Sequence, residues 1–261
     1  MKHIKQWMLL VCIGLLLACQ PSQKYDLVIG TISGPETDLV KVAQKVAKEQ
    51  YGMNVKVFEF TDYHFPNEAL ADGTLDMNIY QHLPFLKASI KAKSYPIEAI
   101  GKTFIYPMGM YSKKYTSIAE LPKNSAIAIP NDPSNETRAL LLLEQAGLIT
   151  LSKKDIMTPH NIVSNPKNLQ IKELDSAQLP RILPDVAAAV INTTFAIPAG
   201  LIPGKDSIYL ESKNSPYANL IVVKINHQKK QEIKHFIDAM HSQPVIDKAN
   251  ELFGTGAIAA W

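Results

Sequence analysis

Cysteine is almost absent from this chain of 261 residues, which contains only Cys12 and Cys19. Cys12 lies in a segment that we expect to be removed on export, so Cys19 would be the one cysteine left. A chain with one cysteine can form no internal disulfide bond. The fold must therefore be stabilised by its hydrophobic core, which a chain of this length can supply.

Sequence motifs of common enzyme classes are also missing. The chain has no G-x-S-x-G, no G-x-x-x-x-G-K-[ST], no H-E-x-x-H and no C-x-x-C. Its seven histidines do not recur at a spacing that places two metal ligands on one helix face. We therefore predict a protein that is not an enzyme and that uses neither a cofactor nor a metal.

Neither sign of charge dominates the composition. Lys and Arg number 27 and Asp and Glu number 24, which gives a net charge of +3. No basic stripe of the kind that binds nucleic acid is present, so we expect no nucleic acid partner.

One long apolar run occurs, and it lies at the N-terminus. Lys2 and Lys5 precede the apolar residues 8–17, and Leu-Leu-Ala-Cys follows at residues 16–19. This order is typical of an export signal that is too short to remain as a membrane span. The last four residues resemble a bacterial lipobox, which implies a lipoprotein signal peptide at 1–18, acylation of Cys19 and a lipid-anchored linker at 19–24. An ordinary signal peptide or a short membrane anchor is the alternative.

Two series of alternating strands and helices follow. In the first predicted helix, apolar residues recur at Leu39, Val42, Ala43, Val46 and Ala47, and the helix ends at Gly52. The first series predicts strands at 25–34, 54–60 and 74–80 and helices at 35–52 and 66–73. The second predicts strands at 125–130, 168–174 and 186–191 and a helix at 132–147. This alternation predicts two α/β lobes with parallel strands.

Two extended segments, 101–112 and 215–224, lead out of the first lobe and back into it. The C-terminal stretch is predicted to be helical, with a break near Pro244. Two lobes joined by two crossings indicate a solute-binding protein that closes about a hinge.

Polar and aromatic side chains follow the predicted strands at the points where the strands end. The apolar run 186–191, for example, ends in Asn192, although an unpaired buried amide costs roughly 1–3 kcal/mol. Ligands of open α/β sheets bind beyond the carboxyl ends of strands. The candidate site residues are Tyr63, Tyr80, His82, Phe85, Asn135, Arg138, Asn192 and Asn219.

This set of side chains suits a free amino acid. A guanidinium group can form a bidentate pair with an α-carboxylate, and amide oxygens can accept hydrogen bonds from the ammonium group. Aromatic rings can hold an apolar or thioether side chain. Ordinary structural roles stay open at this point, because Arg138 can pair with Glu144 and Asn192 can satisfy a turn.

Several blocks of this sequence resemble the NlpA family of lipoproteins. They occur in the same order from about Tyr25 to Trp261 and include "DMNIYQHLPFL", "IAIPNDPSNETRALLLLEQAGLI", "AVINTTFA", "SPYANLIVV" and "FGTGAIAAW". The resemblance implies an α/β, two-lobed periplasmic-binding-protein fold, type II-like, with two hinge crossings. Lobe 1 would comprise 25–106 plus 222–261, and lobe 2 would comprise 107–221.

The resemblance also implies roles for the candidate residues. Arg138 would bind the carboxylate of methionine, and Asn192 and Asn219 would hold its ammonium and carboxylate groups. Asn135 would either bind the ligand or brace the start of its helix. The residues that would surround the methionine side chain are Tyr63, Tyr80, His82 and Phe85.

Four positions depart from the family pattern. Residue 80 is Tyr where Phe is frequent, and residue 85 is Phe where Tyr is frequent, so one hydroxyl group has moved. Glu136 and Thr137 stand where close relatives have smaller residues. We expect Glu136 to face solvent; if it turned inward, it would change the charge of the cleft.

The sequence thus predicts a lipid-anchored, extracytoplasmic protein of the bacterial cell envelope. It would bind L-methionine between its lobes and deliver it to an ABC importer, that is, a permease driven by an ATPase. Another small amino acid or a Met-containing dipeptide is the alternative ligand. A surface lipoprotein that acts through protein partners is the alternative function.

Overall fold

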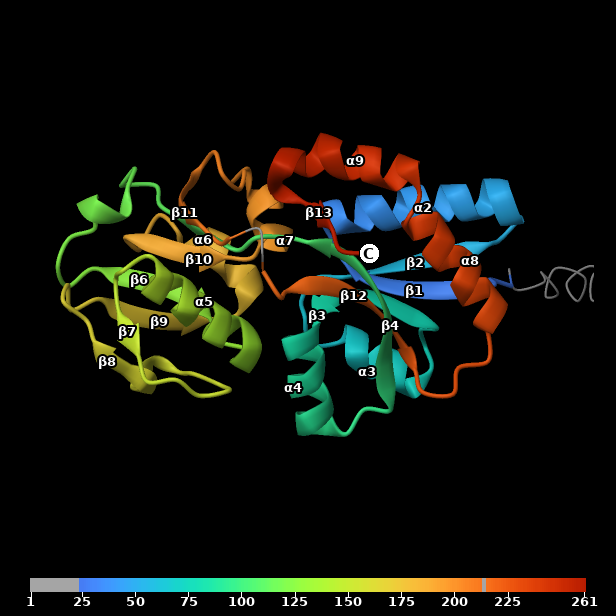
Figure 1. Cartoon of the computed structure of the whole chain (residues 1–261), viewed down its shortest axis with the longest axis horizontal. Helices are drawn as coiled ribbons and strands as arrows, with labels where there is room; N and C mark the ends of the chain where they lie inside the picture. The colour runs from blue at the N-terminus through green and yellow to red at the C-terminus, as the bar shows by residue number, and fades with distance from the viewer. Residues whose placement is uncertain (1–23, 213–214) are drawn as a thin grey trace, which may run out of the picture.

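Two β-sheets organise the computed structural model, which describes residues 24–212 and 215–261 and places the sheets in two neighbouring lobes (Figure 1). The signal peptide expected at 1–18, the acylated Cys19 and linker residues 19–23 lie outside the described residues. None of the helices in the described parts of the chain is both long and apolar enough to cross a bilayer.

The six-stranded sheet of the first lobe has the order β13-β4-β12-β3-β1-β2. Its strands are β1 (Leu27–Ile32), β2 (Val55–Phe60), β3 (Met77–His82), β4 (Ile97–Ile105), β12 (Ala218–Lys224) and β13 (Ile258–Ala259). β1 runs parallel to β2 and β3, whereas β12 is antiparallel to β3 and β4. The chain therefore returns to the middle of this sheet after it has built the second lobe.

The five-stranded sheet of the second lobe has the order β11-β5-β10-β6-β9. Its strands are β5 (Gly109–Tyr111), β6 (Ala126–Pro130), β9 (Gln170–Leu174), β10 (Ala188–Ile191) and β11 (Ser207–Leu210). β6 is parallel to β9 and β10, and β5 is antiparallel to its neighbours β10 and β11. A separate pair joins β7 (Thr150–Leu151) and β8 (Ile162–Ser164).

Helices cover both faces of the first sheet (Figure 1). On one face lie α2 (Pro35–Tyr51), α8 (Lys230–Met240) and α9 (Gln243–Phe253), and on the other lie α3 (Pro66–Asp72) and α4 (Leu83–Lys93). The second lobe carries α5 (Pro133–Gln145), α6 (Leu179–Ile182) and α7 (Thr193–Ala196). Single 3-10 turns occupy Ile118–Glu120, Pro159–Asn161, Ser176–Gln178, Ile197–Ala199 and Gly254–Gly256.

The helix ends follow their local sequence signals. α2 begins at Pro35, whose fixed φ suits a first helical position, and it ends before Gly52, which has a φ of 70°. α5 begins after Asp132, whose carboxylate accepts a hydrogen bond from the backbone N–H of Asn135. The break predicted near Pro244 is confirmed, because α8 ends at Met240 and α9 begins at Gln243.

Most of the predicted elements are present. The predicted strands correspond to β1, β2, β3, β6, β9 and β10, and the predicted helices correspond to α2, α3 and α5. α4 was not predicted; its N-terminal cap is His82 and its first turn contains Pro84. The proposed lobe boundary between residues 221 and 222 falls inside β12, so the sheet pairing favours a crossing a few residues earlier. The division into lobes by residue number stays a prediction.

A core truncation would test whether packing alone stabilises the first lobe. Phe236 of α8 is fully buried against α2 and the sheet. We expect Phe236→Ala to lower the free energy of unfolding by about 3–5 kcal/mol, because it leaves a cavity in a close-packed core. Urea unfolding of the protein would measure this. Phe65→Ala is the matched control, since that ring is 56% exposed, and an equal loss in both variants would contradict the expectation.

Candidate functional site

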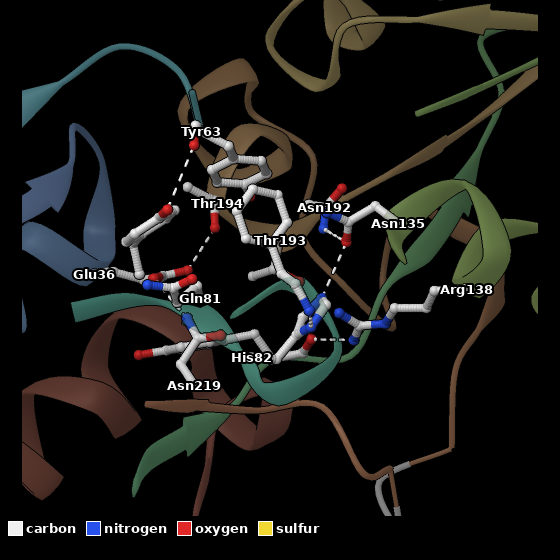
Figure 2. Close-up of a pocket in the computed structure, with 13 residues that line it drawn as sticks. Glu36, Tyr63, Gln81, His82, Asn135, Arg138, Asn192, Thr193, Thr194 and Asn219 are labelled. Atoms are coloured by element: carbon white, nitrogen blue, oxygen red, sulfur yellow. Dashed lines mark hydrogen bonds between the residues drawn. The ribbon is translucent and has the colours of Figure 1, made fainter. Parts of the chain in front are cut away.

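A cavity that is open to solvent and holds about 350 Å³ of empty space, the solvent at its mouth included, lies between the two lobes (Figure 2). All eight residues predicted from the sequence line it, which brings together side chains from five segments of the chain. Five further lining residues were not predicted: Glu36, Gln81, Tyr106, Thr193 and Thr194.

Strand ends and helix starts position these side chains. β3 carries Tyr80 and His82 and runs directly into α4, whose first turn contains Phe85. β6 leads to the start of α5, and β10 leads through Asn192 into α7. Asn219 lies in β12 directly opposite His82 in the strand register. The carboxyl ends of strands from both sheets thus face one space, as expected for an α/β ligand site.

Asn135 lies at the centre of a network of amide groups. Its Nδ2 donates to Asp132 Oδ2 over 2.9 Å, and its Oδ1 accepts from Asn192 Nδ2 over 2.9 Å. The same Oδ1 lies 3.2 Å from His82 Nε2. Asn192 Oδ1 is left buried without a hydrogen-bond partner among the described residues, so an acceptor is available to a ligand.

His82 is held as a neutral imidazole. The backbone N–H of Phe85 donates to its Nδ1, so Nε2 must carry the hydrogen and donate to Asn135. Burial, and then the positive charge of Arg138, lower the pKa of His82 to about 3. This side chain therefore adds no charge to the cavity near neutral pH.

Arg138 forms a buried ion pair with Glu211. Its Nε donates to Oε1 over 2.9 Å and its Nη2 donates to Oε2 over 2.5 Å, while Nη2 also donates to the backbone carbonyl of Tyr106. The ring of Tyr217 lies 4.2 Å from the guanidinium carbon. The pairing of Arg138 with Glu144 that we left open is absent, because Glu144 contacts Lys153 instead. Nε and Nη2 of Arg138, which we expected to bind a ligand carboxylate, are thus occupied by Glu211. Nη1 is the guanidinium nitrogen that remains available to a ligand.

Glu36 places a second buried carboxylate at the cavity. Thr194 Oγ1 donates to its Oε1, and Asn219 Nδ2 donates to its Oε2 over 3.0 Å. Burial raises the pKa of Glu36 to about 7, although these hydrogen bonds and the charge of Arg138 act in the opposite direction. Glu36 was not predicted from the sequence, because an acidic side chain in a first helical turn is common. Glu36 nevertheless lies in the segment that follows β1, and ligands of α/β sheets bind beyond the carboxyl ends of strands. The same argument that identified the other candidates therefore applies to Glu36.

Aromatic rings form the apolar wall of the cavity. The ring of Tyr63 lies 5.9 Å from that of Tyr80 and 5.0 Å from that of Phe195, and Tyr80 lies 5.8 Å from Phe85. The hydroxyl group of Tyr80 donates to the backbone carbonyl of Tyr63 over 3.4 Å. The hydroxyl group of Tyr80 therefore has a hydrogen-bond partner within the fold. The rings of Tyr63, Tyr80 and Phe85 present an apolar surface beside the polar groups of the cavity.

Glu136 does not face solvent as expected. It is 5% exposed, and it is not among the residues that line the cavity. Burial, together with the neighbouring carboxyl group of Glu173, raises its pKa to about 8. Glu136 lies in the first turn of α5 within the second lobe, next to the carboxyl group of Glu173 at the end of β9, so the enclosed side chain favours its neutral form.

The sequence of this chain matches the family described as NlpA lipoprotein over residues 27–261. The chain belongs to the NlpA lipoprotein family. It is 48% identical to the "D-methionine-binding lipoprotein MetQ" of Salmonella typhi over 237 residues, which cover 89% of this chain and 88% of that protein.

Solved structures of family relatives have the same fold. One is an ABC transporter periplasmic substrate-binding protein from Coxiella burnetii, 53% identical with a TM-score of 0.87. Another is a nutrient-binding protein from Burkholderia cenocepacia bound to methionine, 47% identical with a TM-score of 0.88. Each alignment covers 90% of this chain and all of the relative. The two-lobed periplasmic-binding-protein fold is confirmed, and these relatives are binding proteins, as predicted, rather than enzymes.

The buried Glu136 makes a pH-dependent contribution to stability. Its folded pKa lies above the ordinary value of 4.5, so its neutral form stabilises the fold at low pH, and this contribution is lost as pH rises toward 8. We expect Glu136→Gln to melt close to the wild-type temperature at pH 5 and above it at pH 8.5. Thermal unfolding at both pH values would measure the difference. Glu49→Gln, on the exposed surface of α2, is the control, and an equal shift at both pH values would contradict the assignment.

Proposed function

We propose that this chain captures methionine, L-methionine in the first place, between its lobes and delivers it to an ABC importer. The observation that carries the proposal is one cavity that combines a guanidinium nitrogen, an unpaired amide oxygen and an aromatic wall. These are complementary to the carboxylate, the ammonium group and the thioether side chain of methionine. The MetQ relatives and the methionine-bound neighbour support this choice among amino acids.

The residues that line the cavity would each act on one part of the ligand. Arg138 Nη1 would donate to the carboxylate, and Asn192 Oδ1 would accept from the ammonium group. Tyr63, Tyr80 and Phe85 would pack around the thioether, with neutral His82 at the edge of this wall. Asn135 would act mainly on Asn192 and His82, which it already binds, and so would orient them for the ligand.

The location and partners of the protein follow from the same proposal. Cys19 would carry the lipid that anchors the protein to a membrane of the cell envelope, with the folded lobes outside the cytoplasm. A membrane permease and its ATPase would accept the methionine. These steps rest on the lipobox-like sequence and on relatives that are named lipoproteins and a periplasmic substrate-binding protein.

Calorimetric titration of the mature protein tests the ligand. The protein would first be unfolded and refolded to remove any bound ligand, then titrated with L-methionine, D-methionine and a Met-containing dipeptide. We expect saturable heat with one ligand per chain and the highest affinity for L-methionine. Absence of heat and of any thermal shift with all amino acids tested would contradict the proposal. If the dipeptide binds more tightly than methionine, the dipeptide is the preferred ligand.

Removal of one amide tests how the ammonium group is held. We expect Asn192→Ala to weaken methionine binding by about 2–3 kcal/mol, roughly 30- to 150-fold in Kd, because a ligand charge loses a buried partner. Titration calorimetry would measure the change. Asn161→Ala removes an equally buried amide that does not line the cavity and should keep wild-type affinity. Unchanged affinity in Asn192→Ala would assign that residue a structural role only.

A further inference from the structure

Glu36 is an acidic side chain that lines the cavity, and no cationic side chain of the described residues forms an ion pair with it. The Arg138 guanidinium is already paired with Glu211 through two of its nitrogens. The two hydrogen-bond partners of Glu36, Thr194 and Asn219, are both neutral. With Arg138 and Glu211 compensating each other and His82 neutral, an ionised Glu36 gives the cavity a net negative charge.

The carboxylate of Glu36 makes no hydrogen bond within its own helix. Glu36 occupies the first turn of α2, yet it caps no backbone group there, and the helix is N-capped by Gly34 without a side-chain hydrogen bond. The residue is only 4% exposed. Burial of an unpaired carboxylate is costly, so a position of this kind points to a partner that arrives with the ligand.

The remaining capacity of the carboxylate matches such a partner. An ionised carboxylate offers about four acceptor positions, of which Thr194 and Asn219 use one on each oxygen. Thr194 comes from the second lobe and Asn219 from the first, so the two lobes hold the carboxylate jointly at the cavity wall. The free positions are therefore available to a cationic group in the cavity.

We propose that Glu36 is the acceptor that selects ligands with a free ammonium group, and that this ammonium group displaces a proton from Glu36 when it binds. The inference rests on the proposed function, since it assigns a specificity-determining role within the same site. Asn192 Oδ1 would supply a second, uncharged acceptor for the same group.

The groups that face Glu36 are consistent with proton exchange near neutral pH. Its charged or titratable neighbours are Arg138 of α5, Tyr63 after β2 and Tyr106 after β4. Burial raises the pKa of both tyrosines, so they stay neutral in this range. Burial raises the pKa of Glu36 to about 7, so of these four groups at the cavity Glu36 is the one that changes charge between pH 5.5 and 8.

The ligand class follows from the charge. Methionine and a peptide with a free N-terminus both carry an ammonium group and would be accepted on this criterion. N-acetylmethionine and 4-(methylthio)butanoate keep the thioether and the carboxylate but lack the positive charge. With these ligands, the carboxylate of Glu36 would keep its two neutral partners but would gain no positive charge beside it.

The affinity of the wild-type protein for L-methionine should therefore depend on pH. Protonated Glu36 must lose its proton before the ammonium group can bind, so the Kd rises as pH falls below 7. We expect binding at pH 5.5 to be about 30-fold weaker than at pH 8. Calorimetry at pH 7 in two buffers of different ionisation enthalpy should detect release of about half a proton per methionine bound.

Glu36→Gln tests the assignment directly. The amide keeps the size of the side chain but cannot ionise, so methionine should bind about 10- to 100-fold more weakly at pH 8 and with less than a threefold change down to pH 5.5. The preference for methionine over 4-(methylthio)butanoate should fall by the same factor. His64→Gln is the matched control, because His64 bridges the lobes to Asp175 outside the cavity and should leave the pH dependence intact.

The outcomes separate the two proposals. If the wild-type protein binds methionine with a pH-independent Kd and releases no proton, the role of Glu36 is wrong while the proposed function stands. If His64→Gln abolishes the pH dependence, the titrating group is the pair that bridges the lobes, and the role of Glu36 is again wrong. If methionine does not bind at any pH, both proposals are wrong. The wild-type measurements decide the matter even where Glu36→Gln fails to fold.

Discussion

The buried ion pair between Arg138 and Glu211 is the interaction on which the arrangement of the two lobes depends. Arg138 belongs to α5, and Glu211 lies on the crossing that leads back to β12. The same guanidinium donates to the carbonyl of Tyr106, and Glu211 accepts from the backbone N–H of Met108, both on the outgoing crossing. Two ions buried at 4% and 9% exposure are costly unless every hydrogen bond is made. Here those bonds tie the two crossings to each other and to the start of α5.

This pair also determines what the cavity offers to a ligand. Because Glu211 occupies two nitrogens of Arg138, one nitrogen remains for a carboxylate, and the positive charge of the site is already compensated. Glu36 then adds a negative charge that its neutral partners do not balance. The charges of Arg138 and Glu211 cancel each other, whereas the charge of an ionised Glu36 is not cancelled. The net charge of the site therefore depends on Glu36.

Neither lobe contains a complete site. His82 of the first lobe contacts Asn135 of the second, and Glu36 contacts Thr194 (Figure 2). Tyr63 packs on Phe195. A ligand that binds groups from both lobes stabilises the arrangement in which the lobes meet, since it binds that arrangement more tightly than a separated one. Ligand binding would therefore be coupled to closure of the lobes, as in a hinged binding protein.

Local sequence was enough to predict most strands and helices, because apolar periodicity, Pro at helix starts and Gly at helix ends act within a few residues. It was also enough to identify eight cavity residues, since strand ends in α/β proteins converge wherever the sheets lie. It failed for Glu36 and Glu136, which look alike as acidic residues in the first turns of helices. What separates them is burial and the identity of the neighbours, namely Thr194 and Asn219 for one and Glu173 for the other. Only the packing of segments far apart in the chain decides these contacts, and it is desolvation by that packing that converts an ordinary surface carboxyl into a group that titrates near neutral pH.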